Sequence, residues 1–425
     1  MQYPHDFHRV RGALYCERVP VARIASEVGT PVYIYSHKTL VEHLAKLQQA
    51  FRALAPLICF SVKANGNLAI LKLLVKHGAG LDIVSGGELY KALQAGCPSS
   101  KIVFASVGKR PEEIRESLRV GIFCFNVESE PELESIHAIA RAMGKVARVA
   151  LRVNPDVEAH THRHITTGIR GTKFGIDPKT ALAIFRRHSA LSGVRIIGIH
   201  LHIGSQITEA SPFVQAIKRG ANVIRAGRRM GAPIDWINLG GGLGIIYKDE
   251  APQTPKQFAA AVLPLLQSLH ARLILEPGRF IVGNAGILVT EVLYVKKAHG
   301  TRFAVVDAGM NDLIRPALYG AYHEVIPVGV PRPSRNGHGR YDVVGPICES
   351  ADVFARDRQL GAVGSGELLA ILGAGAYGST MASNYNGRLR PVEVLVRGAR
   401  WAVIRRRETR QDLIRYDVIP KAILS

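Results

Sequence analysis

The feature that most constrains the fold is a regular alternation of short β-rich runs with helical stretches. The β-rich runs are 57–62, 81–84, 102–105, 121–126, 147–153, 196–201, 234–239 and 272–275. Strand–helix alternation predicts a parallel sheet, and eight repeats predict a closed (β/α)8 barrel of the TIM type, which usually takes about 250 residues. We therefore expect an α/β fold whose barrel spans residues 33–280.

The pattern changes after Arg279, where β-like runs follow one another without crossover helices. These runs are 286–295, 301–308, 325–328, 341–344, 368–372, 392–396 and 402–406. They predict a second, mainly β domain over residues 281–425. Short β-like pieces near Leu14 and at 32–35 indicate that the N-terminal segment, residues 1–32, joins this domain.

Length and composition describe an ordinary globular protein. The 425 residues allow two domains with a large core, and 47% of them are hydrophobic. No apolar run reaches the roughly 20 residues that span a bilayer. The N-terminus lacks the basic and then apolar order of a secretory signal. We expect a cytoplasmic protein without a membrane partner.

The chain is strongly basic, with 55 Lys and Arg against 34 Asp and Glu, for a net charge of +21. Such a charge can attract nucleic acid, an anionic membrane surface or acidic substrates. The basic residues are dispersed, however, and no basic tail, zinc-finger or leucine-zipper pattern is present. We expect no specific nucleic-acid partner, although a basic nucleic-acid binder is one alternative to an enzyme.

The five cysteines are scattered and form no CxxC pair. This pattern favours neither a structural zinc site nor a disulfide framework.

Lys63 stands where the apolar run 57–62 meets a small polar turn, Ala64-Asn-Gly-Asn67. An unpaired charged amine at the end of a buried strand is costly. The pKa of a lysine in water is about 10.4, and burial or a cationic neighbour brings it towards the nucleophilic range. This placement indicates Schiff-base chemistry.

Further polar residues follow other predicted strands, where the active sites of barrels lie. Three glycines, Gly240, Gly241 and Gly242, follow the seventh strand and allow backbone N–H groups to approach a phosphate. Glu276 and Arg279 follow the eighth strand. A carboxylate there can keep a heteroaromatic nitrogen protonated, and a guanidinium can bind a substrate carboxylate through two hydrogen bonds.

His200 and His202 are two residues apart on a predicted strand and therefore share a face. One of them can stack on a flat cofactor ring. The HxH spacing also suits zinc, for which His160, His162 and His164 would have to supply further ligands. We expect no metal.

Polar, glycine-bearing loops interrupt the second domain at 307–323, 345–352 and 373–378. The composition of these loops is typical of a binding surface rather than of the interior of strands. The residues that they contribute are Arg315, Tyr319, Cys348, Glu349 and Tyr377.

Eight motifs are specific in combination. They are SVKANGN at 61–67, DIVSGGEL at 82–89, HLHIGSQI at 200–207, NLGGGLG at 238–244, EPGR at 276–279, DAGMNDLIRPALYGAYH at 307–323, GPICESADVFA at 345–355 and GAYGSTMASNYNGRLRPVEVLV at 375–396. Together they resemble the fold-type III pyridoxal-phosphate decarboxylases, from Val32 to about Val396. The resemblance implies a barrel with a β domain, as in the alanine racemase-like fold.

The resemblance also implies a cofactor, pyridoxal 5′-phosphate, and residues that bind it. Lys63 forms the Schiff base, His202 stacks on the ring and Glu276 bonds the pyridine nitrogen. The phosphate is bound by Ser205, Gly240, Gly241, Gly242, Gly278 and Arg279, and Tyr377 contacts both cofactor and substrate.

The substrate residues follow from the same resemblance. The substrate carboxylate is held by Arg279, Arg315 and Tyr319, while Glu349 binds the distal ammonium group. Cys348 protonates the carbanion left by CO2. Cys348 and Glu349 are contributed by the partner subunit, which implies a homodimer with two shared active sites.

The implied activity is that of a carboxy-lyase that converts meso-2,6-diaminopimelate to L-lysine and CO2, the last step of lysine biosynthesis. Arg315 and Glu349 favour a substrate with an amino acid at both ends. The alternatives are decarboxylation of ornithine, arginine, lysine or carboxynorspermidine on the same fold and, more remotely, a non-catalytic binding protein.

Overall fold

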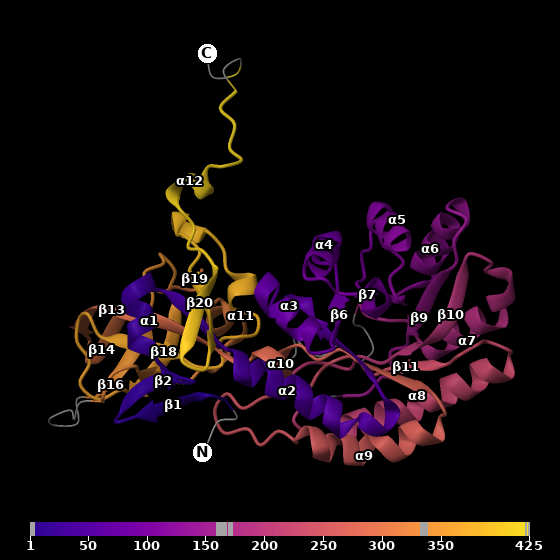
Figure 1. Cartoon of the computed structure of the whole chain (residues 1–425), viewed down its shortest axis with the longest axis horizontal. Coiled ribbons are helices and arrows are strands. Elements are labelled where there is room, and N and C mark those ends of the chain that lie inside the picture. Colours follow the sequence, from indigo (N-terminus) through magenta and orange to yellow (C-terminus); the bar gives the residue numbers. More distant parts are fainter. Residues whose placement is uncertain (1–4, 159–167, 169–172, 332–338, 421–422, 424–425) are drawn as a thin grey trace. The chain divides into compact units, whose positions relative to one another are not determined.

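The computed structural model describes residues 5–158, 168, 173–331, 339–420 and 423 (Figure 1). It divides into two compact units. The barrel unit is Leu40–Val282, and the β unit combines Met1–Thr39 with Gly283–Ser425. The sequence placed the boundaries at 33 and 280. The first boundary lies before Leu40 rather than at residue 33, because β4 (Val32–Ser36) pairs with strands of the β unit.

The barrel unit is built around a closed barrel of eight parallel strands, as the alternation predicted. The strands are β5 (Leu57–Ser61), β6 (Gly80–Ile83), β7 (Ile102–Ala105), β8 (Cys124–Val127), β9 (Ala147–Arg152), β10 (Val194–His200), β11 (Trp236–Asn238) and β12 (Arg272–Leu275). Their order around the barrel follows the chain, and the ring closes where β12 pairs with β5. The carboxyl ends of all eight strands therefore lie at one mouth.

Helices lie outside the strands of the barrel, as Figure 1 shows for α4 to α9. The helices of this part are α2 (His37–Ala50), α3 (Leu68–Lys76), α4 (Gly86–Gln94), α5 (Pro111–Val120), α6 (Glu130–Ala142), α7 (Pro178–Arg186), α8 (Ser211–Arg229), α9 (Pro255–Ser268) and α10 (Arg279–Val282). Several begin at polar caps. Ser85, for example, accepts a hydrogen bond from the backbone N–H of Glu88 at the start of α4.

One end of the barrel is filled by apolar side chains. A buried cluster there consists of Cys59, Val103, Phe123, Cys124, Ile197, Trp236 and Ile274. The buried polar side chains of this unit include His200, Asn238 and Glu276, at or just after the carboxyl ends of their strands, and Asp82 and Asn126, within strands β6 and β8.

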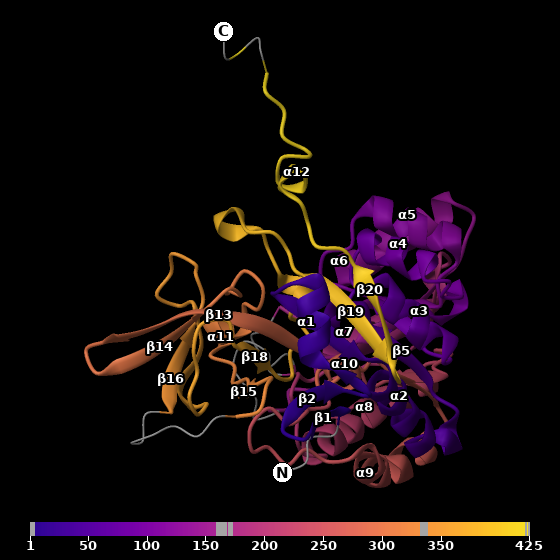
Figure 2. The ribbon, with the colours of Figure 1, turned by 60° about the vertical axis from the view of Figure 1, so that its left-hand side comes forward.

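The β unit contains a three-stranded sheet and a larger nine-stranded sheet (Figure 2). The small sheet is β1 (Phe7–Val10), β2 (Ala13–Cys16) and β3 (Val19–Pro20). Besides β4, the large sheet comprises β13 (Gly286–Ala298), β14 (Thr301–Val306), β15 (Val325–Pro327), β16 (Arg340–Val344), β17 (Val353–Gln359), β18 (Leu368–Ile371), β19 (Val392–Arg397) and β20 (Arg400–Arg405). The helices are α1 (Val21–Val28), α11 (Arg315–Tyr319) and α12 (Arg410–Leu413).

Strand β17 was not predicted. Its sequence, VFARDRQ, carries three charged residues. The four side chains that follow Ala355 are all exposed or partly exposed to solvent. Pairing with β16 on one side holds it in the sheet. Among the described residues, no helix is long and apolar enough to cross a membrane.

Candidate active site

Lys63 lies at the carboxyl end of β5, in a short 3-10 helix, Val62–Ala64. Its Nζ atom lies 2.8 Å from Oδ2 of Asp82 on the neighbouring strand β6. Asp82 is completely buried, and burial raises the pKa of its carboxyl, while Lys63 acts in the opposite direction. The amine therefore rests against a buried carboxylate at the mouth of the barrel.

Glu276 follows β12 and is buried. Its Oε2 atom lies 3.2 Å from Nε2 of His200, and Oε1 accepts hydrogen bonds from the amides of Asn126 and Asn238. Burial opposes ionisation, but His200, Lys63 and the Asn238 amide outweigh it, so the pKa of Glu276 is lowered. The site thus contains a buried carboxylate that stays ionised.

His202 follows β10 and accepts a hydrogen bond on Nδ1 from the backbone N–H of Gly241, at 3.2 Å. Burial, together with the positive charges of Arg152 and Lys63, lowers the pKa of His202 well below its usual value. Its ring is therefore neutral at pH 7, with Nδ1 as the acceptor. A neutral ring is suited to lie against an aromatic cofactor.

The glycine run forms a loop after β11 in which Gly240 and Gly242 have positive φ angles of 65° and 109°. At Gly241 an added Cβ would lie only 2.4 Å from the carbonyl oxygen of Glu276. The loop can therefore contain no side chain at this position, and its backbone stays close to the strand end that carries Glu276.

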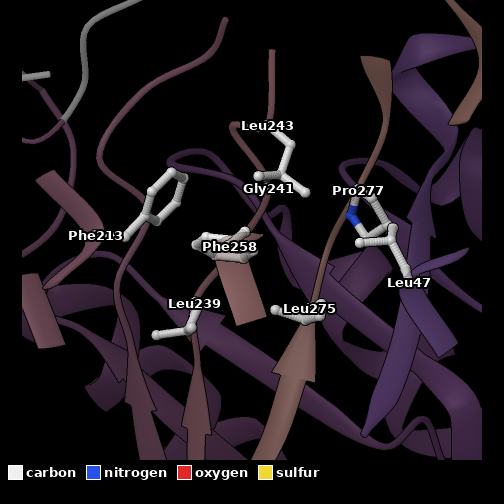
Figure 3. Close-up of a pocket in the computed structure, with 9 residues that line it drawn as sticks. Leu47, Phe213, Leu239, Gly241, Leu243, Phe258, Leu275 and Pro277 are labelled. Carbon is white, nitrogen blue, oxygen red and sulfur yellow. The ribbon is translucent and has the colours of Figure 1, made fainter. Parts of the chain in front are cut away.

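Apolar side chains support this loop. Figure 3 shows Phe213 and Phe258 near Gly241 and Leu243, with Leu239 and Leu275 beyond them. The cavity that they enclose with Leu47 and Pro277 has a volume of only about 10 Å³. It has no room for a ligand, so it serves as packing behind the loop.

Arg279 begins α10, directly after Gly278, and is buried. Its Nη1 atom donates to the Tyr247 hydroxyl at 2.6 Å, and Nη2 donates to Oγ of Ser205 at 3.2 Å. Ser205 and Arg279, both predicted to bind phosphate, are thus brought together although they are 74 residues apart.

The metal alternative concerns His160, His162 and His164, which lie outside the described residues. Among the residues that the structure does describe, no three or more His, Cys, Asp or Glu side chains are grouped to hold a metal ion.

The remaining predicted residues belong to the β unit. Arg315 begins α11 and is buried, with Nη1 at 2.8 Å from Nε2 of His323. Tyr319 ends the same helix, four residues later, and therefore shares a face with Arg315. Tyr377 has a φ angle of 56°, which is uncommon for a residue with a side chain.

Cys348 and Glu349 are exposed in a loop after β16. The carboxylate of Asp352 holds this loop, because it accepts hydrogen bonds from the backbone N–H groups of Met310 and Ile347 at 2.6 and 2.7 Å. The other four cysteines are buried, so Cys348 is the thiol that the fold presents to solvent.

Some residues of the barrel site were not given a role from the sequence. They are Asp82, Asn126, Asn238 and Tyr247. A carboxylate or amide inside an apolar strand is the signal that could have identified Asp82, Asn126 and Asn238, since buried polar groups need partners. Nothing in the sequence around Tyr247 indicates its contact with Arg279.

Comparison with known proteins relates these features to a family. Residues 37–283 match the model of the pyridoxal binding domain of the pyridoxal-dependent decarboxylases. The chain is 48% identical to diaminopimelate decarboxylase of Neisseria meningitidis over 396 residues, which cover 93% of this chain and 97% of that relative. It is 45% identical to diaminopimelate decarboxylase of Haemophilus influenzae, with 97% of each chain covered.

Among solved structures, diaminopimelate decarboxylase of M. jannaschii in complex with L-lysine has the same fold, with a TM-score of 0.93. The two chains are 38% identical, and the match covers 99% of this chain and 100% of that one.

The barrel residues fit pyridoxal phosphate. An amine, a neutral imidazole and an ionised carboxylate come from Lys63, His202 and Glu276. The loop at 240–242 lacks side chains, so a phosphate can approach its backbone closely. This donor set matches the aldehyde, the ring and the phosphate of one molecule.

Proposed function

This chain belongs to the diaminopimelate decarboxylases, a family of pyridoxal-dependent decarboxylases, and from that membership we infer that it converts meso-2,6-diaminopimelate to L-lysine and CO2. It is a carboxy-lyase, and its cofactor is pyridoxal 5′-phosphate. The observation that carries this inference is the buried, ionised Glu276 at the same barrel mouth as Lys63. A carboxylate in this state can hold a pyridine nitrogen protonated.

When bound, pyridoxal phosphate supplies a conjugated cationic ring that takes up the electron pair left by the departing CO2. In our proposal Lys63 binds the cofactor covalently through Nζ, and Asp82 holds that amine as an ammonium group when it is released. Glu276 keeps the proton on the ring nitrogen. The neutral imidazole of His202 would stack on the ring.

The phosphate-binding role is assigned to the glycine loop at 240–242, to Gly278 and to Ser205. Support comes from the glycine loop that excludes a Cβ, and from the guanidinium of Arg279, which bonds Ser205. Arg279 places a positive charge near the phosphate-binding hydroxyl.

The substrate-binding roles rest on the resemblance and on chemistry. Arg279, Arg315 and Tyr319 would bind carboxylate, Glu349 would bind the distal ammonium group, and Tyr377 would contact both cofactor and substrate. Cys348 would deliver the proton on Sγ to the carbon that has lost CO2. Its exposure in the single chain is compatible with donation to a substrate held by another chain.

We further propose a homodimer in which Cys348 and Glu349 of each chain complete the active site of the partner. A single chain leaves both residues exposed, although an acid catalyst works best when shielded from water. A cytoplasmic location is also proposed, on the basis of the chain's membership of a family of biosynthetic enzymes.

The test is CO2 release and product identification with meso-diaminopimelate, lysine, ornithine and arginine. We expect CO2 and L-lysine from meso-diaminopimelate and no more than slow release from the others. Faster release from ornithine, arginine or lysine would instead support the decarboxylase of another basic amino acid. Cofactor binding without any CO2 release would support a binding protein.

A further inference from the structure

The surroundings of Glu276 are more specific than its proposed contact with the pyridine nitrogen requires. Two amides donate to the same carboxylate oxygen, Oε1: Nδ2 of Asn126 at 2.8 Å and Nδ2 of Asn238 at 2.6 Å. They come from β8 and β11, and both residues are completely buried. Both lone pairs of Oε1 are therefore engaged, whereas Oε2, which lies 3.2 Å from Nε2 of His200, keeps a second lone pair for another partner.

The side-chain amide of Asn126 acts as a hydrogen-bond donor to Glu276. Its Oδ1 atom is buried and has no hydrogen-bond partner among the described residues. An unpartnered buried carbonyl oxygen is unfavourable by about 1–3 kcal/mol. A leucine of similar size would avoid that penalty, so the Nδ2 donor is the property of Asn126 that the barrel uses.

Asn238 makes a second connection. Its Oδ1 atom accepts a hydrogen bond from the backbone N–H of Gly240 at 2.8 Å. The carbonyl of Gly240 in turn accepts from the backbone N–H of Glu276 at 2.7 Å. One side chain thus links the carboxylate to the first glycine of the loop.

Charged and titratable groups also face Glu276 from the neighbouring strands. They are His200 on β10, His202 after it, Lys63 after β5, Asp82 on β6, and the buried thiols of Cys59 on β5 and Cys124 on β8. Asp82 is itself buried and acidic, so it disfavours a second negative charge nearby. Neutral donors are therefore needed on Glu276 in addition to the cations.

We propose that Asn126 and Asn238 are positioning residues that keep Glu276 ionised and aimed through Oε2, and that Asn238 also couples this carboxylate to the phosphate-binding loop. This inference rests on the proposed function, because it takes Glu276 as the partner of the pyridine nitrogen. The two asparagines differ in one respect that can be tested. The side chain of Asn126 bonds only Glu276, the proposed partner of the pyridine nitrogen. The side chain of Asn238 bonds both Glu276 and Gly240 of the proposed phosphate-binding loop.

The experiment compares Asn126→Leu and Asn238→Leu with the wild type and with a control, Asn222→Leu, at an exposed position on α8. The apoproteins are titrated with pyridoxal phosphate and with pyridoxal, which lacks the phosphate. The ¹⁵N chemical shift of pyridine-labelled cofactor reports whether the ring nitrogen is protonated. Neither measurement requires turnover.

Both leucine variants should move the ¹⁵N shift towards the unprotonated value and lower the pH at which the ring nitrogen loses its proton. They should lower kcat by about 10- to 100-fold, with a much smaller change in KM. In Asn238→Leu alone, the preference for pyridoxal phosphate over pyridoxal should fall by about 3- to 10-fold, since a loop N–H loses its acceptor. The control should match the wild type in every readout.

A wild-type ¹⁵N shift in both variants would overturn the role in ionisation, and an unchanged preference for pyridoxal phosphate in Asn238→Leu would overturn the coupling. If a leucine variant does not fold, Asn126→Ser and Asn238→Ser carry the same comparison, because each shortens the side chain and withdraws the donor from Glu276. Failure of the wild type to release CO2 from meso-diaminopimelate would count against the proposed function alone, as the binding measurements remain valid.

Discussion

Nζ of Lys63 lies 2.8 Å from Oδ2 of Asp82, so the end of β5 and the interior of β6 are joined by an ion pair. The same oxygen accepts a hydrogen bond from Oγ of Ser61 at 2.7 Å. The lysine side chain is 40% exposed, whereas the aspartate is fully buried. The pair therefore places the amine at the boundary between the barrel interior and the space where a cofactor can enter.

Replacement of Lys63 by alanine should abolish both turnover and the visible absorbance band of the lysine-bound cofactor, because no other amine occupies this position in the proposal. The band in the wild type should disappear on treatment with borohydride. Lys72→Ala, at an exposed position on α3, is the control and should retain both properties. Full activity in Lys63→Ala would rule out the assignment.

Gly241→Ala should weaken the binding of pyridoxal phosphate, since its Cβ would lie 2.4 Å from the Glu276 carbonyl oxygen and the loop would have to shift. We expect a loss of stability of about 1–3 kcal/mol from the overpacking. Gly108→Ala, where nothing lies within 4 Å of the added atom, provides the control. Titration of the apoproteins with cofactor measures the effect, and equal affinities in the two variants would contradict it.

Cys348→Ala should reduce kcat by about 100-fold or more while leaving the cofactor bound, because a proton donor in the transition state is worth about 10²–10⁴ in rate. Cys97→Ala removes a buried thiol and should leave kcat near the wild-type value. Steady-state kinetics and the cofactor spectrum distinguish the two outcomes. Unchanged kinetics in Cys348→Ala would remove its role as an acid.

Asp312, in the β unit, predicts a pH dependence of stability. Burial raises the pKa of its carboxyl to about 7, partly offset by a hydrogen bond from the backbone N–H of Gly309. Because the unfolded pKa is about 3.9, the folded state holds this proton more tightly. The stability that the group contributes is present below about pH 4 and is lost as the pH rises through 7.

The asparagine of Asp312→Asn cannot ionise. The free energy of unfolding of this variant should therefore rise relative to that of the wild type as the pH is raised from 5 to 8, by an amount on the order of 3 kcal/mol. Chemical denaturation at the two pH values measures the difference. Asp249→Asn, at an exposed position, should show little change with pH. The same difference between Asp312→Asn and the wild type at both pH values would refute the prediction.

Much of the fold could be predicted from local pattern. The eight β-rich runs correspond to β5–β12, because strand length, apolar content and the helices between them are properties of neighbouring residues. Strand β17 was missed because its charged residues conceal the alternation. The boundary near residue 33 depended on β4, whose partners β13 and β19 lie far along the chain.

The sequence by itself determined the parallel barrel, the β-rich segment and the identity of the chemical groups, including Lys63, His202, Glu276 and the glycines at 240–242. Only the tertiary structure decided which groups meet. Asn126 reaches Glu276 across 150 residues, and Asp82 reaches Lys63 across 19. The reason is physical: periodicity reports which face of its own strand a side chain occupies, whereas barrel closure and strand register decide which side chains from different strands come within hydrogen-bond distance.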